Sequence, residues 1–377
     1  MGVRIGVLST YPSTQCGIAT FTESWVLAMQ RAGAYVGVVR IVDERQNQVL
    51  PVVHQWVMGS PTGAASVARE LDDYDVAVVQ HEFGIFGGRD GRDVLDVVAL
   101  LDVPVVVVLH TVLTEPTPHQ RSVLAELCSA SAAIVTMTQT AKDRLVAGWG
   151  VHPSRITVIT HGAVMNLEPV SLHRRTPSSP ARILTWGLLG EGKGIEWALL
   201  AMSQLDDVTP RPTYRVVGQT HPRVLERDGE AYRHRLRTMT TELGLEGSVH
   251  FDGDYLPGDE LRRIVRDADI ILLPYDSREQ VTSGVLTEAV AAGKPVVSTS
   301  FPHAVELLSG GAGLLVPQRD PQALAAALRQ LLTEPGRADR MAATSRGLAA
   351  SLAWPAVAQR YLALTRSLTR ARAHSVA

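Results

Sequence analysis

The sequence has few cysteines, a net charge close to zero and no long apolar runs. Each of these shortages argues against a class of protein. Its two cysteines, Cys16 and Cys128, lie far apart and provide neither a disulfide framework nor a metal-ligand spacing. The formal net charge of −2 argues against a protein that holds nucleic acid by bulk charge. No segment approaches about eighteen consecutive apolar residues, and the N-terminus lacks the apolar region of a signal peptide. We therefore expect a cytoplasmic protein with no transmembrane segment and no nucleic-acid partner.

A glycine fingerprint is also missing from the first loop. Residues 3–8 read as a buried strand, residues 18–32 as a helix and residues 36–42 as a second strand. This order resembles a dinucleotide-binding unit, which requires G-x-G-x-x-G between strand and helix. The loop here, TYPSTQCGIATF, contains one glycine. The interpretation of the chain as an NAD-dependent enzyme, which this fingerprint would have supported, thereby loses most of its support.

Strand and helix patterns alternate along the rest of the 377 residues, which suffice for two ordinary domains. Six strands are predicted before residue 160, the pattern restarts with a strand over residues 182–186, and one long charged helix is predicted over residues 223–244. We predict an α/β protein with two doubly wound parallel-sheet domains. The predicted boundaries are 1–165 for the first domain, 166–181 for a linker, 182–351 for the second domain, and 352–377 for a final helix that packs back across the domain junction.

Residues 269–299 read as one strand, loop, helix and strand, and the rest of the second domain is organised around them. In open α/β sheets ligands collect at the carboxyl ends of strands, where Ser283 and Gly284 lie. Ser283 is a favourable N-cap and Gly284 lets a ligand approach the backbone, so the first helical amides could hold an anion. Glu288, one turn further, could accept hydrogen bonds from ribose hydroxyls. The alternative is an ordinary capped core helix with an exposed glutamate.

A second glycine-rich loop, GLLGEGKG over residues 187–194, links the first strand of the second domain to its helix. Glycines let the backbone approach a phosphate, and Lys193 could neutralise it. A Walker A loop would have a hydroxyl residue after the lysine, where this chain has Gly194. Taken alone, the loop reads as a turn with a solvated lysine. Together with Ser283 and Gly284 it predicts a diphosphate site, because both loops end strands of the same predicted sheet.

Polar residues also gather at the predicted strand ends of the first domain. Three strands there end on histidines: His81, His110 and His161. His81 and Glu82 lead into a glycine-rich loop that contains Gly87 and Gly88, and such loops more often bind than merely connect. We therefore expect at least one functional residue at this edge.

The two loops of the second domain together resemble the donor site of the family 4 glycosyltransferases, which are retaining enzymes of the GT-B fold. That family carries G-R-L-x-x-x-K-G and E-x7-E, with the second glutamate in E-A-x-A-x-G-x-P-V. The residues that match are Gly187, Leu189, Lys193 and Gly194 in the first motif and Glu288, Ala289, Ala291, Gly293, Pro295 and Val296 in the second. Two positions depart from the pattern: Leu188 replaces the motif arginine, and Gln280, next to Glu279, replaces the first glutamate.

The resemblance implies two facing Rossmann-like domains with a cleft between them and transfer of a hexose, mannose or glucose, with retention of configuration. The implied donor is a nucleotide diphosphate-sugar of the GDP-mannose or UDP-glucose type, with a slight preference for GDP-mannose and no cofactor. Lys193 and the amides of residues 283–286 would hold the phosphates, Glu288 the ribose, and Glu279 or Gln280 the donor sugar. The implied donor-binding residues are Gly187, Leu188, Lys193, Ser283, Gly284, Val285, Leu286 and Glu288.

The same resemblance assigns the acceptor to the first domain. The implied acceptor-binding residues are Gly17, His81, Glu82, Gly87, Gly88 and His161, with His110 near the reacting centre. The acceptor would be a sugar, a glycoside or a lipid-linked molecule. The basic residues of the tail, Arg366, Arg370 and Arg372, could touch an anionic membrane, although a solvated helix face is the simpler interpretation.

A metal and several other functions remain as alternatives. Asp252-Gly253-Asp254 matches the D-x-D of manganese-dependent transferases, but a turn explains it more simply, and we predict no metal site. A nucleotide-sugar epimerase or an inverting transferase of the same fold would be distinguished by product stereochemistry. A non-catalytic two-lobed sugar-binding protein would bind sugar without a nucleotide.

Overall fold

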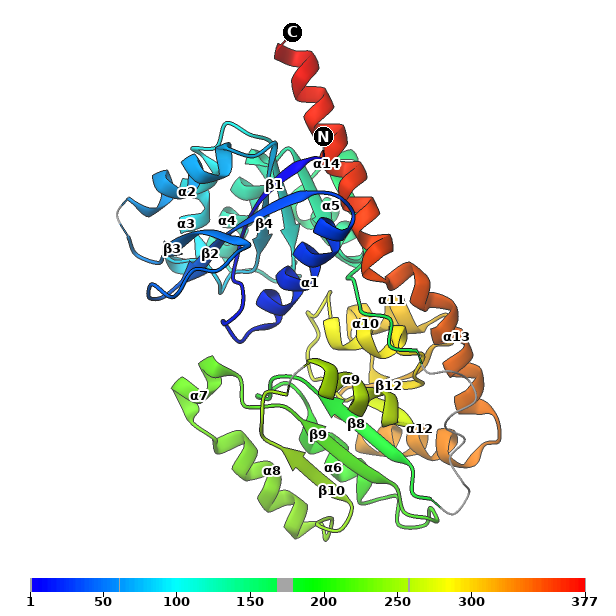
Figure 1. Ribbon diagram of the computed structural model, residues 1–377. Coiled ribbons are helices and arrows are strands. Elements are labelled where there is room, and N and C mark those ends of the chain that lie inside the picture. Colours follow the sequence, from blue (N-terminus) through cyan, green and yellow to red (C-terminus); the bar gives the residue numbers. More distant parts are fainter. Residues whose placement is uncertain (1, 61, 168–178, 257, 377) are drawn as a thin grey trace. The chain divides into compact units, whose positions relative to one another are not determined.

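The computed structural model describes residues 2–60, 62–167, 179–256 and 258–376. The chain divides into two compact units, one of Met1–Gly162 with Trp354–Ala377 and one of Ala163–Ala353, here called unit 1 and unit 2. Each contains one parallel sheet with helices packed on it (Figure 1). Most of the predicted linker, residues 168–178, lies outside the described residues.

Unit 1 has, in its described part, a seven-stranded parallel sheet in the order β3-β2-β1-β4-β5-β6-β7. The order reverses between β1 and β4, which is where ligands bind in doubly wound sheets. The strands are β1 (Arg4–Ser9), β2 (Tyr35–Val42), β3 (Val52–Val57), β4 (Val76–His81), β5 (Val105–Leu109), β6 (Ala133–Thr136) and β7 (Ile156–Val158). The helices are α1 (Gly17–Arg31), α2 (Gly63–Asp72), α3 (Asp93–Val98), α4 (Pro118–Ala130), α5 (Gln139–Trp149) and α14 (Trp354–Val376), with short 3-10 turns η1 (Arg89–Gly91) and η2 (Pro153–Arg155).

The prediction of six strands in this half of the chain was wrong, because it missed β3. The central strands β4 and β5 are valine-rich and buried on both faces, so they stand out as continuous apolar runs. β3 lies at the sheet edge and is only half-buried, and its centre carries His54 and Gln55. An edge strand with polar residues leaves no such run in the sequence.

The last helix, α14, belongs to unit 1 by its contacts. Trp25 of α1 and Tyr361 of α14 are buried and meet edge to face, with ring centroids 5.4 Å apart. Val357 lies in the same hydrophobic core. At its far end the side chains of Arg366, Arg370 and Arg372 are exposed.

Unit 2 has a six-stranded parallel sheet in the described residues, in the order β10-β9-β8-β11-β12-β13. Here the order reverses between β8 and β11. The strands are β8 (Arg182–Trp186), β9 (Thr213–Val217), β10 (Val249–Asp252), β11 (Ile270–Leu273), β12 (Val296–Thr299) and β13 (Gly313–Val316). The helices are α6 (Ile195–Met202), α7 (Pro222–Asp228), α8 (Ala231–Glu242), α9 (Gly258–Asp267), α10 (Gly284–Ala291), α11 (Pro302–Leu308), α12 (Pro321–Thr333) and α13 (Arg337–Leu352).

The long helix predicted over residues 223–244 is two helices, α7 and α8. Gly229 ends α7 with a φ of 59°, which glycine adopts without steric cost. The charged pattern continues on both sides of this break, so it did not reveal where the first helix ends.

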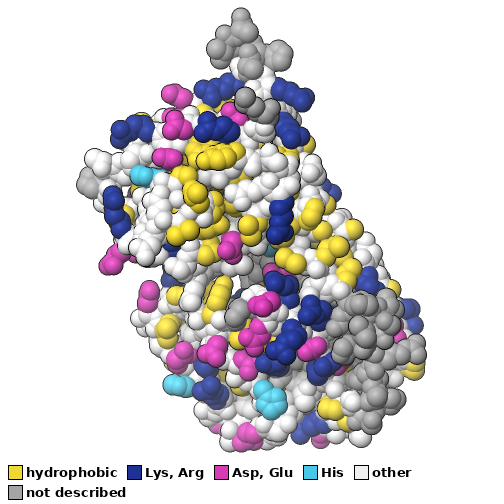
Figure 2. Space-filling model, viewed as in Figure 1, with side chains coloured by type: hydrophobic (Ala, Val, Ile, Leu, Met, Phe, Trp, Pro, Cys, Tyr) yellow, Lys and Arg dark blue, Asp and Glu magenta, His cyan; other side chains and the backbone are white. Residues whose placement is uncertain are grey.

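No helix in the described ranges is both long enough and apolar enough to cross a membrane. On the face shown in Figure 2, Lys and Arg side chains are interspersed with Asp and Glu side chains. This mixed surface accords with a formal net charge of −2.

Candidate functional site

The two predicted loops of unit 2 lie side by side where the strand order reverses. The loop after β8 is tied to the loop after β11 by a hydrogen bond from the Asp276 amide to the Gly192 carbonyl, at 2.9 Å. Gly194 has a φ of +64°, and a Cβ there would overlap the carbonyl oxygen of Pro274. Gly187 lies against Val285 of α10, so a Cβ on it would be 3.5 Å from that side chain. Gly194 therefore lets the two loops approach one another at the carboxyl edge of the sheet, where Gly187 lies in ordinary contact distance of α10.

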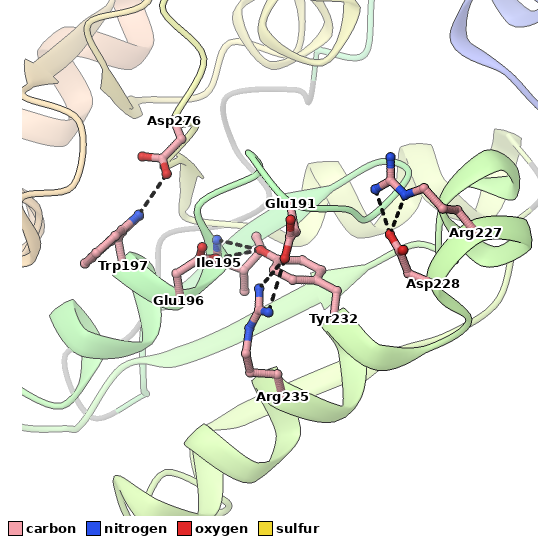
Figure 3. Close-up of polar contacts among 9 residues, drawn as sticks. All are labelled: Glu191, Ile195, Glu196, Trp197, Arg227, Asp228, Tyr232, Arg235 and Asp276. Carbon is pink, nitrogen blue, oxygen red and sulfur yellow. Dashed lines mark hydrogen bonds and ion pairs between the residues drawn. The ribbon is translucent and has the colours of Figure 1, made fainter.

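Figure 3 shows how the start of α6 is held. The Tyr232 hydroxyl donates to Glu196 at 2.6 Å and accepts from the Ile195 amide at 3.3 Å. The Trp197 indole donates to Asp276 at 3.3 Å, which joins α6 to the loop after β11. Because the first amide of α6 is already paired, this helix does not offer it to a phosphate.

Lys193 provides a cation at this place. Its Nζ lies 4.5 Å from the centroid of the Tyr275 ring, and Tyr275 in turn stacks on Phe301 with centroids 5.4 Å apart. The lysine forms no ion pair with any carboxylate in the described residues, and burial lowers its pKa to about 8. A lysine held against an aromatic face without a counter-ion is ready to receive an anion.

His221 lies near this lysine and beside Arg223, and the sequence patterns did not predict either residue. The His221 amide donates to the Leu189 carbonyl at 2.8 Å, which binds the loop after β9 to the loop after β8. Burial and the charges of Arg223 and Lys193 lower the pKa of His221. His221 and Lys193 are thus close enough for each charge to act on the other. The available signal was His221-Pro222, which follows β9 and begins α7.

The N-terminus of α10 offers fewer amides than the predicted four. The Ser283 Oγ accepts from the Leu286 amide at 3.2 Å, so Ser283 is the N-cap as predicted. The Ser283 amide donates to Nδ1 of His303 at 2.8 Å. The amides of Gly284 and Val285 have no acceptor among the described residues, and helix geometry gives them none. These two amides are the ones available to an anion.

His303, at the start of α11, fixes the loop before α10 and was also overlooked. It is 5% exposed, and its own amide donates to the Gln280 carbonyl at 3.3 Å. Because a backbone N–H can only donate, Nδ1 carries no proton when it accepts from Ser283. The sequence signal was a histidine after Pro302 at the carboxyl end of β12.

We expect His303→Ala to raise the donor KM about tenfold, because an unpaired buried amide at Ser283 lets the loop shift. Asparagine should restore the donor KM, since its Oδ1 occupies the place of Nδ1, whereas glutamine, whose oxygen mimics Nε2, should not. Steady-state kinetics with varied donor and a thermal melt of each variant test this. Equal rescue by asparagine and glutamine would contradict it.

Glu288 lies half-buried one turn into α10. Burial raises the pKa of Glu288, opposed by a hydrogen bond with Trp186 and by the charge of Arg262. Trp186 ends β8 and is 3% exposed, so the bond turns the carboxylate toward the carboxyl edge of that strand. The exposed glutamate of the alternative interpretation is therefore not what the structure contains.

The structure does not distinguish Glu279 from Gln280 as the partner of a donor sugar. Both are half-buried in the same loop. Gln280 Nε2 donates to the Thr282 carbonyl at 3.2 Å, which turns this amide back onto the loop. Leu188 is half-buried in the β8 loop and has no charge to replace the family's arginine.

In unit 1, Phe21 brings two of the predicted histidines together. The rings of His110 and His161 each lie 4.9 Å from it, centroid to centroid. His110 Nε2 donates to the Gln80 side-chain oxygen at 2.8 Å, and His161 Nδ1 donates to the Gly162 carbonyl at 2.7 Å. Burial lowers the pKa of His110 to about 3 and that of His161 to about 4. Both are neutral near pH 7, and the ring nitrogen that carries no proton can accept a hydrogen bond from a hydroxyl.

His81 lies beneath its loop and not on the surface, which corrects its expected contact with an acceptor. It has no exposed surface and is enclosed by Phe83 and Phe86, at 5.1 and 6.1 Å between centroids. Neither ring nitrogen has a hydrogen-bond partner among the described residues, and burial lowers the pKa of His81 to about 4. The apolar residues that follow it in the sequence fold back over it.

The other predicted acceptor residues are placed as follows. Glu82 accepts from the Gly84 amide at 2.7 Å, which shapes its own loop. Gly87 and Gly88 lie against Asp93, whose carboxylate a Cβ on either glycine would overlap. Gly17, at the start of α1, is exposed with open space around it.

A separate hollow in unit 2 includes the first aspartate of the D-x-D sequence. The hollow, of about 640 Å³, is lined by Arg215, Arg237, Val249, His250, Phe251 and Asp252. Asp252 pairs with Arg215 across it. Within the described ranges no group of three His, Cys, Asp or Glu side chains is arranged to hold a metal ion.

Comparison with known proteins finds two family matches. "Glycosyl transferases group 1" matches residues 180–334 and "Glycosyltransferase Family 4" matches residues 17–165. The chain is 29% identical to a glycogen synthase of Mycobacterium tuberculosis. The match covers 70% of this chain and 64% of the glycogen synthase. A D-inositol 3-phosphate glycosyltransferase of Acidothermus cellulolyticus is 29% identical over 75% of this chain and 65% of its own. The chain thus spans under two thirds of the length of these relatives.

The fold is shared with a solved structure, the Anabaena protein HepE in complex with UDP-glucose. The TM-score is 0.74 at 19% identity, over 97% of this chain and 99% of the other. At that identity the likeness concerns the fold, which is GT-B.

Proposed function

The chain belongs to the group 1 and family 4 glycosyltransferases, and from this premise we propose that it transfers a hexose from a nucleotide diphosphate-sugar to a hydroxyl acceptor with retention. One observation carries the proposal: the half-buried cation of Lys193 has no counter-ion in the described residues and lies at the strand-order reversal that also presents the open amides of Gly284 and Val285. A diphosphate supplies the charge and the acceptor oxygens that this arrangement lacks.

The donor assignment follows from unit 2. Lys193 and the amides of Gly284 and Val285 would bind the diphosphate, and Arg223 would add the charge that the family draws from the arginine replaced by Leu188. Glu288, oriented by Trp186, would accept from the ribose hydroxyls. Glu279 or Gln280 would contact the hexose. The sequence slightly favoured GDP-mannose as the donor. HepE holds UDP-glucose, which supports a UDP-sugar as a second candidate donor.

The acceptor assignment rests on unit 1. His110 and His161 are neutral near pH 7. Gly17 leaves open space at the first residue of α1. In a front-face displacement the departing diphosphate takes the acceptor proton. Preorganised positive groups then stabilise that leaving group, and one such group contributes a factor of about 10²–10³ in kcat. Lys193 and α10 would do this in unit 2.

A panel of nucleotide sugars tests the proposal. We expect GDP-mannose, UDP-glucose or a close relative to raise the Tm, with slow hydrolysis of the same donor and with the anomeric configuration retained in the product. EDTA should not change either result. Absence of stabilisation by every nucleotide diphosphate would overturn the proposal, and an inverted product would favour the inverting alternative.

A further inference from the structure

Unit 1 contains a buried arginine, Arg40, that has no counter-ion among the described residues. Arg40 is the sixth residue of β2 and is 3% exposed. Its Nη2 donates to the Gln46 Oε1 at 2.7 Å and, at longer range, to Ser13 Oγ at 3.4 Å and Thr14 Oγ1 at 3.5 Å. Its Nε is buried and has no partner. Within the described ranges, every group that accepts a hydrogen bond from this guanidinium is neutral.

Such an arrangement is costly unless something else supplies negative charge. Arginine remains protonated in proteins, and charged side chains this deeply buried are normally paired. Arg40 forms no ion pair with any described carboxylate, and the nearest acidic residues along the chain, Asp43 and Glu44, are exposed. Burial lowers the pKa of Arg40, as it does for an uncompensated cation. An anion from outside would compensate it.

The location suits a ligand. Arg40 pairs in register with Ser9 at the carboxyl end of β1, and β1 borders the reversal of strand order in unit 1. Ser13 and Thr14 belong to the loop that leads from β1 into α1. The amides of Gly17 and Ile18 open that helix and have no acceptor in the described residues. The guanidinium of Arg40 therefore contacts the loop that leads to these unpaired donors.

Gln46 occupies a position that an anionic oxygen could take. Its side chain is exposed, while its backbone is held by Gln55 of β3 through bonds of 2.9 and 2.6 Å. Binding would exchange a neutral acceptor on Nη2 for a charged one, and charge-assisted bonds are roughly twice as strong.

We propose that Arg40, together with Ser13 and the start of α1, binds an anionic group, a phosphate ester or a carboxylate, carried by the acceptor. This rests on the proposed function of unit 1 as the acceptor-binding unit. The acceptor is then a negatively charged sugar or glycoside, and Arg40 selects it over the neutral form.

The test gives Arg40 a counter-ion of its own. Gln46→Glu keeps the shape of the side chain and places a tethered carboxylate on Nη2. We expect a higher Tm and about 10- to 100-fold weaker binding of inorganic phosphate. Gln330→Glu, an exposed position on α12, makes the same charge change and should leave phosphate binding unaltered. Arg40→Met should weaken binding by the same factor.

All titrations are made in the Lys193→Ala background, so that the donor site does not contribute. Glucose 6-phosphate, glucuronate and glucose then identify the group: tight binding of the first indicates a phosphate ester, and of the second a carboxylate. The proposal would be overturned if glucose bound as tightly as glucose 6-phosphate and glucuronate. It would also be overturned if Gln46→Glu left the binding of phosphate unchanged. Nucleotide diphosphate binding to the unaltered chain reports on unit 2, so the proposed function and this inference fail separately.

Discussion

Lys193→Ala should lower kcat/KM for the nucleotide-sugar donor by about 10²–10³. Removing one preorganised charge-stabilising group from a desolvated site typically has this effect. The chain has three lysines, and Lys193 is held over the Tyr275 ring without a counter-ion among the described residues. Steady-state kinetics at saturating acceptor measure the change.

The matched control is Lys142→Ala. Lys142 lies in unit 1 and donates to the Ile156 carbonyl at 3.1 Å, so its loss should lower the Tm and leave the donor kinetics unchanged. A Lys193→Ala enzyme within threefold of the unaltered one would remove this lysine from the donor site.

The same lysine predicts a pH dependence. With a pKa of about 8 in the donor-free protein, Lys193 is charged below that value and loses its proton as the pH rises through it. The affinity for a diphosphate should therefore fall between pH 7 and pH 9, and this fall should be absent from Lys193→Ala. A donor Kd that does not change over this range would contradict the assignment.

Glu288→Ala should cost about 10²–10³ in kcat/KM, since two charge-assisted hydrogen bonds to a ribose would be lost. Glu288→Gln keeps one acceptor oxygen, so its loss in kcat/KM should be intermediate between the unaltered enzyme and Glu288→Ala, at about tenfold. The effect should depend on the ribose: a 2′-deoxy donor should lose less on mutation than the ribo form. Kinetics with both donors measure the coupling.

Glu334→Gln controls for the loss of one negative charge in unit 2. Glu334 follows α12 and pairs with Arg337 at 2.6 Å, so its replacement should leave both donors unaffected. If Glu288→Ala weakened the deoxy and ribo donors equally, the carboxylate would act on the fold of α10 and not on the sugar.

Much of the candidate donor site follows from the sequence because its signals are local. Ser283 is an N-cap by its place before an apolar helix, and β8, β10, α9 and β13 lie at the residues predicted for them. Gly194 is a glycine because only glycine accepts its φ so close to Pro274. Caps, buried strands and left-handed glycines depend on neighbours a few positions away, which a sequence displays directly.

The contacts that complete the site could not be obtained in this way. The Ser283 amide meets His303 twenty positions later, and Lys193 lies over Tyr275 only because β8 and β11 are neighbours in the sheet. His81 ended a strand, as predicted, yet two phenylalanines bury it.

By itself the sequence determined the α/β alternation, the two glycine-bearing loops at strand ends and the family resemblance carried by their motifs. The tertiary structure decided which amides of α10 remain open, which histidines are enclosed, and that Arg40 donates only to neutral acceptors in the part of the chain that the structure describes. The physical reason is that strand order sets which distant side chains meet, and desolvation then sets their charge. Neither the order nor the burial is written in any short stretch of the chain.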